Sequence, residues 1–87
     1  MRKKEIMETW KETQSGLVKV FKFRNFLKAV DFVNDIAKVA EAENHHPDIL
    51  IHSYNQVKVT FITHDEGKIT CKDYSLAKLI DALIVHN

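Results

Sequence analysis

The change of hydrophobic period at Asn25 constrains the fold of this chain most. Over residues 25–43, apolar side chains recur at intervals of three and four, as on one face of a helix. The apolar set is Phe26, Ala29, Val30, Val33, Ile36, Ala37 and Ala40. Asn25 suits an N-cap, and Pro47 prevents continuation because proline disfavours helical backbone at the residue before it. One long amphipathic helix is therefore predicted over residues 25–43.

Segments on both sides of this helix favour β-structure. The candidate strands are residues 9–13, 17–23, 54–63 and 68–71. The third is the clearest, because Val57, Val59 and Phe61 fall on one face of an alternating pattern. Gly16 belongs to the connection between the first two strands and Gly67 to the turn between the last two. Two antiparallel strand pairs are predicted, one before and one after the helix.

A second helix is predicted at the end of the sequence, over residues 73–85. Thr70 and Asp73 have the spacing of a capping box, and an apolar set follows them. The set is Leu76, Ala77, Leu79, Ile80, Leu83 and Ile84. The order β-β-α-β-β-α is typical of a two-layer α+β fold, in which helices cover one face of an antiparallel four-stranded sheet. We expect one domain over residues 1–87, with the other sheet face left for water, a ligand or another subunit.

Composition excludes several classes of function. Thirteen Lys and Arg against twelve Asp and Glu give a net charge of +1, so no nucleic-acid partner is expected. No segment approaches the roughly 20 apolar residues of a membrane span, and residues 1–10 lack the apolar run of a leader. The single cysteine, Cys71, allows no internal disulfide, which favours the cytoplasm. A chain of this size buries only about 60% of its surface on folding, so self-association is plausible.

Three histidines, His45, His46 and His64, are the candidate catalytic residues. Histidine has an ordinary pKa of about 6.5, so it can give or take a proton near neutral pH. Successive residues of an extended chain point to opposite sides, so His45 and His46 serve one ligand only if the backbone bends or the ligand lies edge-on. Pro47 would hold such a bend rigid. His64 follows a strand, where functional residues are often placed.

Two other interpretations of these histidines stay open at this point. They are three unrelated surface side chains, or they bind a metal ion together with Asp48, Asp65 and Glu66. The spacing gives the metal site little support, because neither HxxxH nor HExxH occurs and adjacent histidines rarely bind one ion. The spacing therefore argues against a metal site.

The histidines also belong to a longer pattern with fixed spacings. Its elements are Glu41, three spacers, His45-His46-Pro47, six spacers, Tyr54, nine spacers, His64, eight spacers and Asp73. This pattern resembles the signature of the pterin-4a-carbinolamine dehydratases. Trp10, "FKFRNF" at 21–26 and "THDEGKIT" at 63–70 extend the resemblance over most of the chain. The segment "DILIHS" is at the long end of the family spacing, and the turn has one glycine where many members have two, so the pocket rim is expected to differ.

The resemblance implies an enzyme that dehydrates 4a-hydroxytetrahydropterin to quinonoid dihydropterin without metal or cofactor. By this resemblance, His45 and His64 are the acid and base, and His46 orients the pterin. The implied substrate-binding residues are Glu41, Asn44, Pro47, Ile62, Thr63 and Asp73. Asp73 is equally well explained as the cap of the last helix alone.

The resemblance implies partners as well as a reaction. Family members form homotetramers or homodimers, and animal members also act as dimerisation partners of a homeodomain transcription factor. A non-catalytic interaction module is therefore the rival function. The physiological setting stays open between recycling for an aromatic amino-acid hydroxylase and molybdopterin metabolism.

Overall fold

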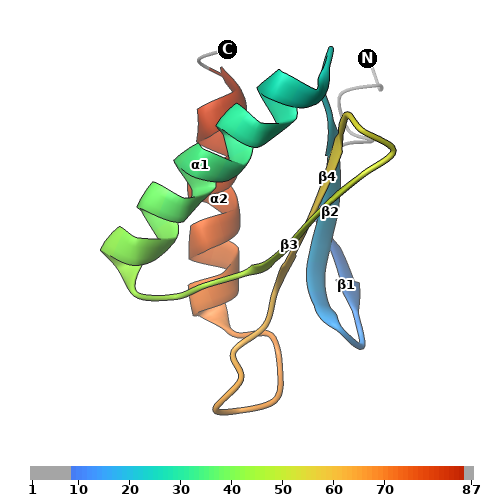
Figure 1. Ribbon diagram of the computed structural model, residues 1–87. Helices are drawn as coiled ribbons and strands as arrows, with labels where there is room; N and C mark the ends of the chain where they lie inside the picture. The colour runs from blue at the N-terminus through green and yellow to red at the C-terminus, as the bar shows by residue number, and fades with distance from the viewer. Residues whose placement is uncertain (1–8, 86–87) are drawn as a thin grey trace, which may run out of the picture.

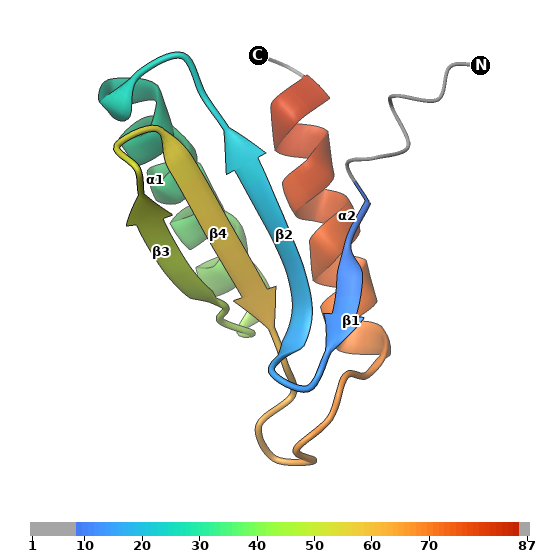
Figure 2. The same cartoon turned by 90° about the vertical axis from the view of Figure 1, so that its right-hand side faces the viewer.

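A computed structural model describes residues 9–85 as a four-stranded sheet with two helices (Figure 1). The elements are β1 (Lys11–Thr13), β2 (Gly16–Lys22), α1 (Phe26–Glu43), β3 (Asp48–His52), β4 (Gln56–Phe61) and α2 (Cys71–Val85). The strands lie in the order β1-β2-β4-β3, and every neighbouring pair is antiparallel. Both helices lie behind the sheet in Figure 2, on one of its faces. The predicted α+β class and element order are confirmed.

The second pair of strands is not the pair that was predicted. Residues 48–52, for which no strand was predicted, form β3. Residues 68–71 form no strand, and Lys68 makes a single bridge with Thr63. The β3–β4 hairpin turns at Ser53 and Tyr54, which both have positive φ, 51° and 53°. Hairpin turns of this kind are usually signalled by Asn-Gly or Gly-Gly, so the sequence pattern missed this one. The 68–71 segment instead leads into α2, which begins at Cys71.

The predicted boundaries of α1 agree with the structure, but its buried face is rotated. The Asn25 side chain caps the helix by accepting the Lys28 N–H at 2.9 Å. Phe26 and Ala37 were assigned to the apolar stripe, yet both are exposed, whereas Phe32 is buried. The stripe that meets the sheet runs through Ala29, Phe32, Ile36 and Ala40. Phe26 lies in the first turn, before the helix reaches the core.

The core lies between the sheet and the two helices. Its buried members are Leu17, Phe21, Val57, Val59 and Phe61 from the sheet, with Ala29, Phe32, Ile36, Leu76, Ala77 and Ile80 from the helices. Gly16 permits close packing between the start of β2 and the end of β4, because a Cβ there would lie 2.4 Å from the Phe61 carbonyl oxygen. Across residues 9–85, neither helix is long and apolar enough to cross a membrane.

Candidate active site

The end of α1 fixes the position of the histidine pair. Asn44 adopts the left-handed conformation, with φ 53° and ψ 42°. Its N–H bonds to the Glu41 carbonyl at 3.3 Å, and the His45 N–H bonds to the Ala40 carbonyl at 3.2 Å. This pair of bonds is the Schellman motif, which ends a helix and turns the chain away from its axis. Asn44 therefore sets the direction in which His45 leaves the helix.

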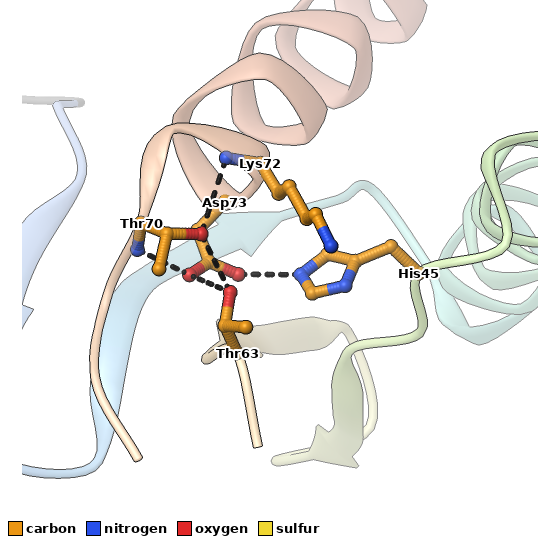
Figure 3. A network of polar contacts seen from close by, with 5 residues as sticks. All are labelled: His45, Thr63, Thr70, Lys72 and Asp73. Atoms are coloured by element: carbon orange, nitrogen blue, oxygen red, sulfur yellow. Dashed lines mark hydrogen bonds and ion pairs between the residues drawn. The ribbon is translucent and has the colours of Figure 1, made fainter. Parts of the chain in front are cut away.

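His45 turns inward and meets Asp73, a residue 28 positions later in the first turn of α2. His45 Nε2 lies 2.6 Å from Asp73 Oδ1, and the side chains are 14% and 0% exposed. The His45 ring is parallel to that of Phe61, with 8° between the planes and 6.0 Å between the centroids. Figure 3 shows how His45 approaches Asp73 from a different segment of the chain. The ends of α1 and β4 and the start of α2 thus build one corner.

The second oxygen of Asp73 binds two donors from the segment before α2. Asp73 Oδ2 accepts the Thr63 hydroxyl at 3.0 Å and the Thr70 N–H at 2.9 Å. The two threonine hydroxyl oxygens are 2.7 Å apart. Asp73 therefore caps α2, as the capping-box spacing predicted, and contacts His45 with its other oxygen. The cap predicted for Asp73 is therefore present, whereas its role in substrate binding stays a prediction.

His46 points to a different partner on the surface. Its Nε2 lies 2.6 Å from Glu41 Oε2, and the two side chains are 54% and 78% exposed. The backbone after Asn44 thus separates the two imidazoles, as expected for successive residues of an extended chain. Pro47, which follows them, is partly buried.

His64 stands apart from this polar cluster. It is exposed in the turn after Thr63, and its side chain makes no hydrogen bond or ion pair within the described part of the chain. Ile62 is partly buried, whereas Thr63 is buried and bound to Asp73. The structure therefore gathers His45, Thr63 and Asp73, with His46 and Glu41 paired beside them in sequence.

Sequence reasoning missed two members of the corner. The inward alternation of β4 already pointed to Phe61 as a core residue, but not to its contact with an imidazole. Thr70 was predicted only as a cap, and its hydroxyl contact with Thr63 depends on how the connection after β4 folds back. Among the residues described, no three His, Cys, Asp or Glu side chains gather as they would around a metal ion. Asp48, Asp65 and Glu66 do not complete such a group.

Comparison with known proteins identifies the class to which this fold and site belong. The family model described as "Pterin 4 alpha carbinolamine dehydratase" matches residues 1–83. A relative from Picosynechococcus sp., named "Putative pterin-4-alpha-carbinolamine dehydratase", is 49% identical over 74 residues, which cover 85% of this chain and 79% of that protein. The chain therefore belongs to the pterin-4a-carbinolamine dehydratase family, whose name denotes a hydro-lyase.

Two solved structures are similar to this fold. The "transcriptional coactivator/pterin dehydratase" of Brucella melitensis has a TM-score of 0.78 and 32% identity, covering 86% of this chain and 81% of that one. A pterin dehydratase-like protein described as a RuBisCO assembly factor of the α-carboxysome has a TM-score of 0.72 and 23% identity, covering 86% and 88%. At that identity the second similarity establishes the fold alone.

Proposed function

We propose that this protein is a pterin-4a-carbinolamine dehydratase that removes water from 4a-hydroxytetrahydropterin. The main support is the His45 imidazole, held 2.6 Å from the buried Asp73 carboxylate in a chain that carries the complete family pattern. A nearly buried histidine fixed by a carboxylate is well suited to general acid–base catalysis, because its orientation is set before substrate binds. The proposal assigns the activity to residues 1–87 as one domain.

The reaction needs one acid and one base. Hydroxide is a poor leaving group, so an imidazolium protonates the 4a-hydroxyl, which then leaves as water. A neutral imidazole accepts the proton of a ring N–H as the C=N bond of the quinonoid product forms. We assign these two steps to His45 and His64. The His64 side chain is exposed and makes no hydrogen bond or ion pair with any described residue, so it is available to a ligand.

Substrate binding is assigned to the surface around His45. His46 and Glu41 form an exposed pair that offers a hydrogen-bond donor and an acceptor to a pterin edge. Asn44 and Pro47 flank the two adjacent histidines in the sequence, Ile62 follows Phe61, and these three residues complete the proposed rim. Thr63 is buried and bound to Asp73, so its contribution runs through that carboxylate. The scheme uses no metal and no cofactor.

The test is the absorbance change when freshly generated 4a-hydroxytetrahydropterin is mixed with the protein. We expect decay well above the uncatalysed rate, unchanged after prolonged treatment with EDTA. His52→Ala is the matched control, because His52 lies on β3 and its side chain contacts, within residues 9–85, the hydroxyl of the neighbouring Ser53 rather than any group of the site. It should keep the wild-type rate. Decay at the uncatalysed rate by folded protein would overturn the proposal, and loss with EDTA that zinc restores would establish a metal enzyme instead.

The rival function is a non-catalytic interaction module. The Brucella relative is described as both coactivator and dehydratase, and the open sheet face here exposes Val20 and Leu50. A module of this kind has no need of the His45–Asp73 pair. If the wild-type protein is folded but inactive in the absorbance assay, this alternative becomes the better explanation.

We further propose that the chain self-associates as a homotetramer or homodimer. Strands β1 and β3 are sheet edges, and α2 exposes Tyr74 and Leu79. Unpaired edges and exposed apolar side chains are surfaces that a second copy can cover. Light scattering at micromolar concentration should give a multiple of the monomer mass. The cytoplasmic location, and the choice between hydroxylase-linked recycling and molybdopterin metabolism, stay predictions.

A further inference from the structure

The hydrogen bonds that lead to Asp73 form a chain in which the donor and acceptor of each bond are determined. The Thr63 hydroxyl donates to Asp73 Oδ2 at 3.0 Å, so its single proton is already used. The 2.7 Å contact between the two threonine hydroxyls must therefore carry the proton of Thr70. Thr70 Oγ1 in turn accepts the Lys72 N–H at 3.3 Å (Figure 3). The donors therefore follow one another from the Lys72 N–H through the hydroxyls of Thr70 and Thr63 to the Asp73 carboxylate.

This direction determines what Asp73 offers to His45. The Thr63 hydroxyl and the Thr70 N–H both point at Oδ2, which is therefore an acceptor. Oδ1 is left for His45 Nε2, 2.6 Å away. The Thr63 hydroxyl and the Thr70 N–H stabilise the charged form of this fully buried carboxylate, and a carboxylate can only accept. Nε2 must then carry the proton of the shared hydrogen bond.

We propose that Thr63 and Thr70 are positioning residues that orient Asp73, keep the His45 proton on Nε2 and leave Nδ1 as the atom that exchanges a proton with the substrate. The role of Nδ1 in exchanging a proton with the substrate rests on the proposed function, whereas the position of the proton on Nε2 does not. Nδ1 lies on the side of the ring turned away from Asp73 in Figure 3 and has no hydrogen-bond partner among the described residues. A ring nitrogen without a partner, in a side chain that is only 14% exposed, is a natural place for a ligand or a water.

The Asp73→Asn variant tests the proton position directly. Because the donors of Thr63 and Thr70 both point at the Oδ2 position, the amide oxygen takes that place and the amide nitrogen faces His45. The amide N–H then donates to Nε2, so the imidazole proton moves to Nδ1. Long-range ¹H–¹⁵N NMR of histidine-labelled protein distinguishes the two tautomers, and His45→Ala assigns the signals. The spectra are recorded at a pH where the ring is neutral.

We expect Nε2–H in the wild-type protein and Nδ1–H in Asp73→Asn. A wild-type signal with the proton on Nδ1 would overturn the proposal, even if no variant folds. A folded Asp73→Asn variant that keeps Nε2–H would overturn it as well. If the tautomers behave as expected but the wild-type protein has no dehydratase activity, the positioning inference stands and the proposed function fails.

The role of the threonines is tested with Thr63→Val and its matched control Thr63→Ser. Valine has the shape of threonine without the hydroxyl, whereas serine keeps the donor. With dehydratase activity as readout, we expect Asp73→Asn to lower kcat by about 10²–10⁴-fold at similar KM, because the wrong tautomer removes the acid–base group. Thr63→Val should lower kcat by a smaller factor and Thr63→Ser should restore it. Equal kcat in the folded valine and serine variants would show that the hydroxyl is only structural.

Discussion

The adjacent residues His45 and His46 each pair with a carboxylate, at the same Nε2–O distance of 2.6 Å. The surroundings of the two pairs are opposite. In the His45–Asp73 pair the side chains are 14% and 0% exposed, whereas in the His46–Glu41 pair they are 54% and 78% exposed. An exposed ion pair typically contributes about 0–1 kcal/mol, because water solvates both charges nearly as well. Breaking a buried pair typically costs about 3–5 kcal/mol, because one polar group stays buried without its partner. Distance alone therefore says little about what a pair does.

The difference suggests that the two neighbouring histidines have separate roles, acid–base catalysis for His45 and substrate recognition for His46. His45 is held by Asp73, which has further hydrogen bonds to Thr63 and Thr70. Its orientation is fixed before any ligand arrives, as acid–base catalysis favours. His46 and Glu41 can change rotamer at little cost, which suits recognition of a substrate edge.

The largest contrast is expected in kinetics. His45→Ala should lower kcat and kcat/KM together by about 10²–10⁴-fold, because a group that transfers a proton is lost. His46→Ala should chiefly raise KM. Steady-state kinetics of the two variants provides the measurement. Changes of equal size in the same kinetic constant for both variants would refute the separate roles. Changes below about twofold in both variants would indicate unrelated surface histidines.

His64 should behave like His45 although it has no comparable support from the structure. His64→Ala is expected to lower kcat as His45→Ala does. The double variant should fall little below either single variant, because an acid and a base that act in one step are not additive. The same assay, extended to the double variant, measures this. Strictly multiplicative losses would mean that the two histidines act independently.

The free energy of unfolding should also differ between variants of the two carboxylates. Asp73→Ala removes the partner of His45 and the acceptor for Thr63 and the Thr70 N–H, so the free energy of unfolding should fall by about 3–5 kcal/mol. Glu41→Ala should change it by less than about 1 kcal/mol, because that pair is exposed. Urea unfolding followed by circular dichroism gives both values. Comparable losses would show that burial does not distinguish the pairs.

The smallest effect is expected for Glu41→Gln. Loss of one exposed charge should raise KM less than about fivefold, in line with the roughly 1 kcal/mol limit for such pairs. High salt should reduce the difference between variant and wild type further, because exposed charges are screened. KM measured at low and high ionic strength tests this. A large increase that persists in high salt would mean that Glu41 contacts the substrate in a desolvated site.

Local sequence signals were sufficient for much of this protein. Asn25 and Pro47 delimited α1, because capping and the proline restriction act within a few residues. The alternation of Val57, Val59 and Phe61 predicted which side of β4 is buried. Spacing also singled out the histidines and Asp73 as candidates. The bounds of α1 and the buried side of β4 rest on interactions between residues close together along the chain, whereas the choice of the histidines and Asp73 rested on the resemblance to a family pattern.

Tertiary structure decided which candidates meet. The pattern did not reveal β3, because its pairing with β4 depends on a turn at Ser53 and Tyr54 that carries no usual turn signal. Nor did it show that His45, and not His46, faces Asp73. That choice follows from the left-handed Asn44 and from the start of α2, which brings a residue 28 positions away to the end of α1. Contacts over such distances depend on how the layers pack, which no local pattern in the sequence records.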